Sequence, residues 1–275
     1  LQRALDAATV PDCAFEGCSH CGVCGTDFGH NIVVKPPTIP EFAGHFTPNQ
    51  DKAQKIRMWF GKIDEMSLIS HLDLVRLFDR AIRRAALPIS FTGGYHPGPK
   101  ISIANALSLG ITSNGEIVDF ELTDEMEVEE FRTRLAAQLP DHVPIYRVEE
   151  VDLKSLNAIR LMDRAEYLIT VQTATDTAGI TPPWQQWIDK IINTPEILWE
   201  KFTKSGHKTQ INLRDRLFSL SLESTQDHQA IIRFTGSCRN DGTNLSPDNL
   251  VYMLEQIAQI EFQLLHVHRQ QLILS

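Results

Sequence analysis

Four cysteines near the start of this chain are the residues whose type and spacing most directly indicate chemistry. Cys13, Cys18, Cys21 and Cys24 have the spacing C-x4-C-x2-C-x2-C, and Cys238 stands alone far downstream. Thiolates are soft metal ligands, and disulfides across such short loops would be strained. The spacing therefore predicts a metal site.

Two metals fit this spacing. Bacterial ferredoxins hold three corners of an iron–sulfur cluster with a C-x2-C-x2-C run, which favours such a cluster here. Zinc is the alternative, although zinc ribbons usually separate two cysteine pairs by a longer insert that this sequence lacks. The C-x3-C-x2-C motif of radical enzymes that use S-adenosylmethionine is also absent from the sequence.

A second constellation lies within residues 67–119. Residues 70–86 predict an amphipathic helix, with apolar side chains on one face and a row of arginines on the other. The row consists of Arg76, Arg80, Arg83 and Arg84. Because only Asp73 and Asp79 are close by, the row keeps positive charge that could bind a phosphate or a carboxylate. The alternative is a solvated charged face.

The loop FTGGYHPGPK follows this helix directly. Gly93 and Gly94 permit a positive φ, and two prolines stiffen the loop. Tyr95 could stack on a base and His96 could form a hydrogen bond, while Lys100 adds a charge. We interpret the loop and the arginines as a surface that binds an anion or a base. The alternative is a rigid connection between a helix and a strand.

Glu116 and Asp119, on the next predicted strand, could form an acid–base pair. Their spacing of three residues places them on opposite faces of a regular strand, which argues against joint catalysis. The segment contains neither a P-loop nor a GxGxxG fingerprint. A stand-alone hydrolase or transferase that uses His96, Lys100, Glu116 and Asp119 is an alternative function, and a structural dimerisation module is another.

The charge of the chain is unevenly distributed. The formal net charge is -9, which argues against general binding to nucleic acid. Residues 55–110 nevertheless carry 8 basic and 4 acidic residues, a balance of +4, whereas residues 111–152 carry 3 and 12, a balance of -9. Since the sequence has neither a membrane-spanning apolar run nor a secretory signal, we expect a cytoplasmic protein without a membrane partner.

The elements that position these residues follow from hydrophobic periodicity. In the first half, strands are predicted at 55–64, 100–107, 115–123 and 144–153, and helices at 70–86 and 127–138, with a turn at TSNG (112–115). In the second half, strands are predicted at 165–173, 196–203, 217–224, 230–236 and 262–274, and helices at 182–192 and 246–260. Ser246 is the expected N-cap of the last helix, with Pro247 in its first position.

This order predicts an α+β protein with two tandem ferredoxin-like (β-α-β-β-α-β) domains. We place the first at 55–155 and a looser second one at 156–275. A Cys-rich tail (1–30) and a Pro-rich linker (31–54) precede them. The chain begins at Leu1, and its first residues read like the end of a helix, so we expect it to be part of a longer polypeptide.

The stretch SHLDLVRLFDRAIRRAALPISFTGGYHPGPKISIANALSLGITSNGEIVDFEL (70–122) resembles the signature of the radical-SAM-linked domain of unknown function. CSHCGVCGTDFG (18–29) resembles the cysteine tail that joins this domain to an upstream radical SAM enzyme. INLRDRL (211–217) is similar to a degraded form of the Asp-Ile-Arg-Pro stretch of the family, in which only Arg214 is retained.

The resemblance implies that the chain is the C-terminal, accessory part of a radical SAM protein, often one with a cobalamin-binding-like domain. S-adenosylmethionine would then bind only in the upstream module, as the same chain or a separate subunit. The expected function is recognition of an anionic substrate, with RNA as the candidate. The family supplies no catalytic residues.

Overall fold

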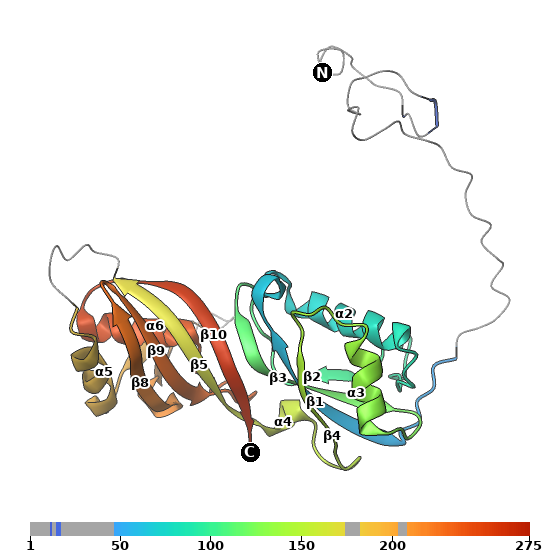
Figure 1. Cartoon of the computed structure of the whole chain (residues 1–275). Helices are drawn as coiled ribbons and strands as arrows, with labels where there is room; N and C mark the ends of the chain where they lie inside the picture. The colour runs from blue at the N-terminus through green and yellow to red at the C-terminus, as the bar shows by residue number, and fades with distance from the viewer. Residues whose placement is uncertain (1–11, 13–14, 18–46, 174–181, 203–207) are drawn as a thin grey trace. The chain divides into compact units, whose positions relative to one another are not determined.

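The globular part of the chain is one α+β unit built on a single large sheet. The structure is a computed structural model, and it describes residues 12, 15–17, 47–173, 182–202 and 208–275. The chain divides into the units Leu1–Thr47 and Pro48–Ser275. The second unit contains a mixed eight-stranded sheet with helices, which confirms the predicted fold class (Figure 1). No helix of the described ranges has the length and apolar character that crossing a bilayer requires.

The first half follows the predicted order of strands and helices. Its strands are β1 (Gln54–Lys62), β2 (Ile101–Ile103), β3 (Thr112–Leu122) and β4 (Ile145–Glu150), and its helices are η1 (Asp64–Leu68), α2 (His71–Arg84) and α3 (Val128–Ala136). The strands lie in the order β4-β1-β3-β2, and neighbouring strands are antiparallel. Side chains of α2 and α3 share one buried cluster with β1 and β3, so both helices cover the same face.

The second half repeats this order with an insertion. It contains α4 (Ala158–Leu161), β5 (Met162–Thr173), α5 (Trp184–Asn193), β6 (Leu198–Phe202), β7 (Lys208–Asn212), η2 (Arg214–Arg216), β8 (Leu217–Gln226), β9 (Gln229–Ser237), α6 (Pro247–Ala258) and β10 (Phe262–Leu274). Its part of the large sheet has the order β10-β5-β9-β8. The predicted cap of α6 is confirmed, because the Ser246 side chain accepts a hydrogen bond from the Asn249 backbone and Pro247 opens the helix.

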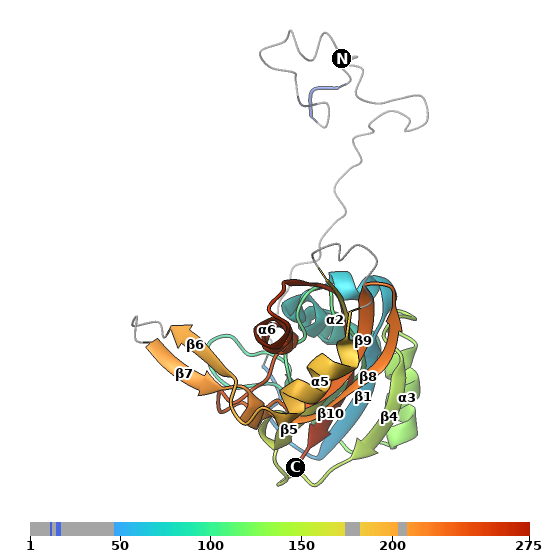
Figure 2. The same cartoon turned by 90° about the vertical axis from the view of Figure 1, so that its left-hand side faces the viewer.

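The predicted strand at 196–203 belongs elsewhere. In the structure β6 pairs with β7, a strand that the sequence did not indicate, and the two form a separate hairpin. The hairpin extends away from the large sheet (Figure 2). β6 therefore fits the local pattern of a strand while its partner is a neighbouring segment, and it does not add to the main sheet.

The two halves meet where β3 and β10 run parallel. Thr112 pairs with His268 and Ser113 pairs with Arg269. The predicted turn at residues 112–115 is therefore wrong: these residues are the first part of β3, and the pairing with β10 overrides their turn-like sequence. The approach is so close that a Cβ on Gly115 would lie 2.4 Å from the Cα of Gln271. The predicted division into two domains after residue 155 stays a prediction.

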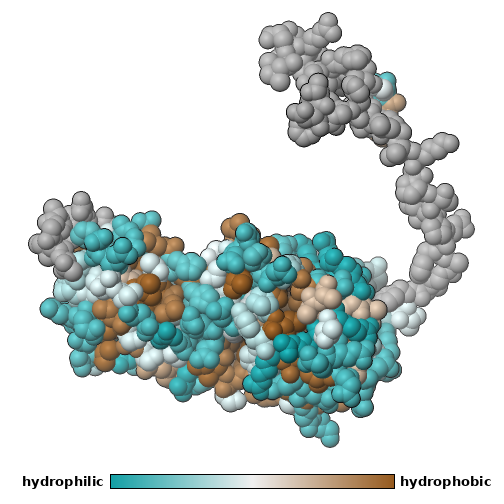
Figure 3. Space-filling model, in the orientation of Figure 1, coloured by the Kyte–Doolittle hydropathy of each residue, from teal (hydrophilic) through white to brown (hydrophobic). Residues whose placement is uncertain are grey.

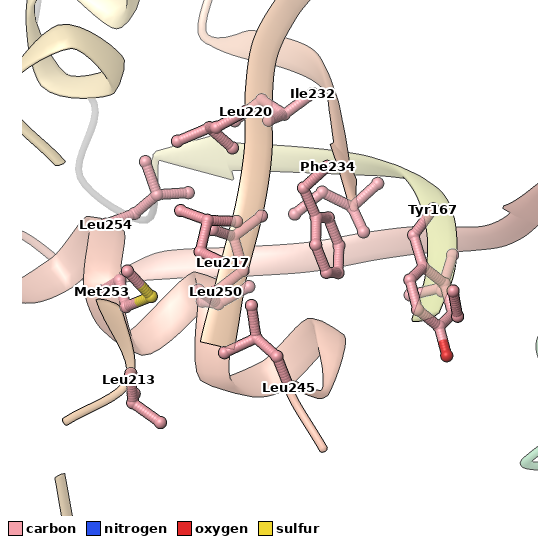
Figure 4. Packing of buried hydrophobic residues seen from close by; sticks show 14 of the residues in the cluster. Tyr167, Leu213, Leu217, Leu220, Ile232, Phe234, Leu245, Leu250, Met253 and Leu254 are labelled. Atoms are coloured by element: carbon pink, nitrogen blue, oxygen red, sulfur yellow. The ribbon is translucent and has the colours of Figure 1, made fainter. Parts of the chain in front are cut away.

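Each half has its own buried cluster. Aromatic rings of Phe60, Phe78, Phe120 and Phe131 pack edge-on or tilted in the first. In the second, side chains of α6 pack against those of β8 and β9, as Figure 4 shows for Leu250, Leu220 and Phe234. These two cores fix the elements that carry the candidate site.

Candidate anion-binding surface

Helix α2 presents its arginines to solvent, as the sequence predicts. The Ser70 side chain accepts a hydrogen bond from the Asp73 backbone and begins the helix. The buried face consists of Leu74, Phe78, Ala81 and Ile82, and the four arginines lie outside it. At the other end, Arg134 from α3 donates to the carbonyl oxygens of Ala85 and Ala86, which fixes the end of the helix. The arginine row is thus held on a rigid element.

The four arginines differ in their partners. Arg76 pairs with Asp73 at 3.1 Å, and Arg83 pairs with Asp79 at 2.9 Å. Arg84 donates only to the backbone oxygen of Arg80, at 3.4 Å. Within the described ranges, neither Arg80 nor Arg84 has an acidic partner. Two exposed positive charges near the C-terminal end of α2 are therefore available to a ligand.

The loop after α2 is closed by its own hydrogen bonds. The Thr92 backbone donates to Gly98 at 2.8 Å, and the Gly98 backbone donates to the Thr92 hydroxyl at 3.0 Å. Gly94 has a φ of +101°, in the region that favours glycine. Tyr95 is 93% exposed, and its only ring contact among the described residues is the edge of His96, 4.8 Å away. The loop thus presents an uncovered aromatic ring.

Lys100 and Gly93 have structural partners. Lys100 binds the Glu121 carboxylate at 3.1 Å, and Lys52 binds the same oxygen at 2.9 Å. Burial acts to raise the pKa of Glu121, but these two lysines outweigh it and hold the pKa below its ordinary value. Gly93 lies against Gln50, whose side-chain oxygen would be 3.0 Å from an added Cβ. Lys100 is therefore less available to a ligand than the arginines are.

The helix arginines and the loop lie at one end of the first-half sheet. Ile89, five residues after the last residue of α2, bridges to Leu122 at the end of β3, and the bridge between Phe91 and Pro99 closes the loop beyond it. No hydrogen bond or ion pair given for residues 47–173 joins the loop to the arginines. The structure therefore places the predicted residues on neighbouring parts of a surface and does not gather them into one pocket.

An acidic pocket lies at the same end of the sheet. Its volume is about 690 Å³, and it is lined by four glutamates, Arg134 and apolar residues: Gln54, Pro88, Glu125, Met126, Glu127, Val128, Glu130 and Glu150. Because like charges repel, this pocket disfavours an anion there. Any anion is confined to the side that α2 and the loop form.

Glu116, the first of the two candidate acid–base residues, is buried in an ion pair that sequence reasoning missed. Its carboxylate accepts two hydrogen bonds from Arg269 of β10, at 2.7 and 2.5 Å. Arg269 also donates to Asn105 at 2.7 Å. Burial acts to lower the pKa of Arg269, but the Glu116 charge outweighs it and raises the pKa. Burial also lowers the pKa of Lys62, which lies within range of both charges.

Asp119 is held in a second buried ion pair. Arg57 donates to its two oxygens at 2.7 and 3.0 Å, and the Ala158 backbone at the start of α4 donates to it at 2.6 Å. Arg57 and Asp119 are also direct partners across β1 and β3. Both candidate carboxylates are thus engaged by different arginines. The signal in the sequence was the charged residues within the apolar strand KIRMWFGKID.

His266 and His268 converge on one hydroxyl. His266 Nε2 lies 3.2 Å and His268 Nδ1 lies 2.8 Å from Thr112 Oγ1. Burial, and then the nearby His266, lower the pKa of His268 below its ordinary value. The pair reinforces the contact between β3 and β10. Cys238 is buried, as expected of a small core residue.

One group of described residues has the donor atoms and spacing for a metal ion. The ligand atoms of Asp64, Glu65 and His142 lie within 4.8 Å of one another. Both ring nitrogens of His142 already contact the carboxylates, at 3.0 and 3.1 Å. The predicted ligands Cys13, Cys18, Cys21 and Cys24 lie outside the described residues.

Comparison with known proteins gives a family match and several weak likenesses. Residues 55–247 match the family described as "Uncharacterized protein conserved in bacteria (DUF2344)". The chain is 30% identical over 77 residues to the probable GTP-binding protein EngB of Methanococcus maripaludis, a match that covers 27% of this chain and 33% of that protein.

Two solved structures share 9% identity with this chain. A Cbf5–Nop10–Gar1 complex has a TM-score of 0.43, and the match covers 78% of this chain and 48% of that chain. An H/ACA RNP bound to a substrate RNA containing 2'-deoxyuridine has a TM-score of 0.40, with 78% and 47% covered. This chain thus spans less than half of either structure, and likenesses this weak carry no argument about its fold or function.

Proposed function

We propose that this chain, which belongs to the DUF2344 family of uncharacterized bacterial proteins, is an accessory domain that binds single-stranded RNA for a radical SAM enzyme. Its two halves are then a tandem pair of ferredoxin-like folds, of which the first carries the RNA-binding surface. The resemblance of residues 18–29 and 70–122 to radical-SAM-linked proteins supports the link to an upstream radical SAM module as its partner.

The observation that carries the RNA proposal is the pairing of two kinds of contact at one end of the sheet. Arg80 and Arg84 are exposed and have no acidic partner within the described ranges, so their guanidinium groups can bind phosphates. Tyr95 is almost fully exposed beside His96, so its ring can stack on a base. Phosphate contacts together with stacking are typical of proteins that bind single strands.

The rest of the charge distribution favours a local contact. The net charge is -9, and the acidic pocket lies beside the surface. A nucleic acid that lay across a wide area would meet these acids, whereas a short single strand can follow α2 and the loop alone. We therefore expect a small footprint and a modest affinity that depends on salt.

Changing Arg80 and Arg84 together to Ala tests the proposal. We expect at least a tenfold loss of affinity for a single-stranded RNA of about 12 nucleotides, and a salt dependence that falls by about 1.4, or about 0.7 for each phosphate contact. Tyr95→Ala should cost about 1–3 kcal/mol of binding free energy, while Tyr95→Phe keeps the stacking ring. Fluorescence anisotropy of labelled RNA at several salt concentrations measures both effects.

The matched control changes Arg132 and Arg160 to Ala, which removes two positive charges from α3 and α4. This variant should bind RNA like the unaltered chain. Binding that ignores salt and survives both Arg80→Ala/Arg84→Ala and Tyr95→Ala would remove RNA as the substrate. Equal binding of duplex and single strand would contradict the role of Tyr95.

The proposed accessory role includes a metal at the cysteine tail. Four thiolates from Cys13, Cys18, Cys21 and Cys24 are a complete ligand set for an iron–sulfur cluster, with zinc as the alternative. After anaerobic reconstitution with iron and sulfide, we expect bound iron and a charge-transfer absorption that Cys21→Ser abolishes and Cys238→Ala retains. Stoichiometric zinc without that absorption would overturn the cluster and leave the alternative.

A further inference from the structure

Four large leucines are exposed around the place where the two halves meet. Leu68, Leu72 and Leu109 are 72%, 66% and 64% exposed, and Leu265 is 41% exposed. Leucine side chains are usually buried, so a group of them on a surface marks a contact. We call these four residues the leucine patch.

The structure connects the members of this patch. The Gly110 backbone donates to the carbonyl oxygen of Ser67 at 2.8 Å, which brings the segment that carries Leu109 against the end of η1. Leu109 and Leu265 line the same hollow of about 340 Å³, together with the start of α6. Hydrophobic residues are visible among hydrophilic ones along the seam between the halves in Figure 3.

The charges beside the patch are arranged in a self-complementary way. Asp64 and Glu65 lie at the start of η1, one turn before Leu68, and their only ion-pair partner within the described ranges is His142. Arg76 lies one turn after Leu72, on α2, and its side chain is 70% exposed. Acids, two leucines and an arginine thus follow one another along the corner between η1 and α2.

We propose that the leucine patch binds the same patch of a second copy of this chain. Two copies related by a two-fold axis near Ser70 place Leu68 of one copy against Leu72 of the other. The same axis places Asp64 and Glu65 against Arg76 of the other copy. A two-fold interface requires one surface to be its own complement, and this sequence of charges and leucines meets that requirement.

This dimer is independent of the proposed RNA binding. Arg80, Arg84 and Tyr95 lie beyond Arg76, toward the other end of α2 and in the following loop, so the interface does not use them. Variants of the leucine patch should therefore keep their affinity for RNA. Failure of one proposal leaves the other intact.

Sedimentation velocity of the full chain tests the dimer. Between about 1 and 300 µM, the range in which small interfaces associate, the mass should rise from 31.1 kDa toward twice that value. Leu72→Glu places an unpaired charge in the interface and should weaken association at least tenfold. Leu153→Glu changes a leucine that is 44% exposed outside the patch, and it should have no effect.

A charge exchange makes the test specific for the two-fold arrangement. Glu65 is the better residue to change, because Asp64 has a φ of +48° that a longer side chain tolerates less well. Glu65→Arg and Arg76→Glu should each weaken self-association, since each places like charges together. An equimolar mixture of the two variants should associate again, because each then meets its complement.

Two results would overturn the proposal. One is a chain that stays monomeric over the whole concentration range while its thermal unfolding shows it to be folded; the patch would then belong to a different partner. The other is a dimer that Leu72→Glu leaves unchanged, or a mixture of the two charge variants that does not associate.

Discussion

Replacing Arg269 with Met is expected to lower the free energy of unfolding by about 3–5 kcal/mol, the cost of leaving one partner of a buried ion pair alone. Glu116 is fully buried, and its carboxylate accepts two hydrogen bonds from Arg269. Without the guanidinium, only the nearby Lys62 can offset the carboxylate charge, which places the expected loss toward the lower end of that range. Urea unfolding followed by circular dichroism measures it.

The double variant Arg269→Met/Glu116→Leu serves as the control. Replacing both members of a buried ion pair by apolar residues of similar volume is often neutral or stabilising. We therefore expect the double variant to regain most of the stability that the single variant loses. A single variant as stable as the unaltered protein would show that this pair does not hold the two halves together.

Changing Asp119 to Ala should also cost about 3–5 kcal/mol. This change leaves the Arg57 guanidinium, which is 6% exposed, without its carboxylate partner. It also removes the acceptor of the Ala158 backbone at the start of α4. Asp119→Asn keeps the shape and part of the hydrogen bonding, so it should lose less than Asp119→Ala does.

Asp79→Ala is the matched control for this second change. It breaks the exposed ion pair with Arg83, and such pairs contribute about 0–1 kcal/mol. A loss as small for Asp119→Ala as for Asp79→Ala would contradict the structural role of Asp119. If Asp119→Asn kept full stability but abolished a measurable activity, the enzymatic alternative would return.

The elements with a clear period could be predicted from the sequence. Helix α2 has apolar residues at helical spacing and a serine cap, and α6 has its capping serine and proline. β10 covers the predicted residues 262–274 from end to end. In these segments the local pattern and the tertiary environment favour the same structure.

The elements that were predicted incorrectly depend on a distant partner. Residues 112–115 have turn-forming residue types, but β10 extends β3 through them. β2 is confined to Ile101–Ile103, although its apolar pattern continues to residue 107. β6 was assigned to the main sheet, yet its partner is β7. Hydrogen bonding to a partner strand decides such cases, and a local pattern does not identify that partner.

The same division applies to the candidate site. The sequence by itself determined that α2 carries an outward row of arginines, that a glycine-rich loop follows it, and that the cysteines have the spacing of metal ligands. Only the tertiary structure decided that Arg80 and Arg84 remain without acidic partners while Lys100 is engaged, and that Glu116 and Asp119 are held in buried ion pairs. The reason is physical. Helical periodicity and residue type act over a few positions, whereas Arg269 meets Glu116 across 153 residues and Arg57 meets Asp119 across 62, distances that only folding closes.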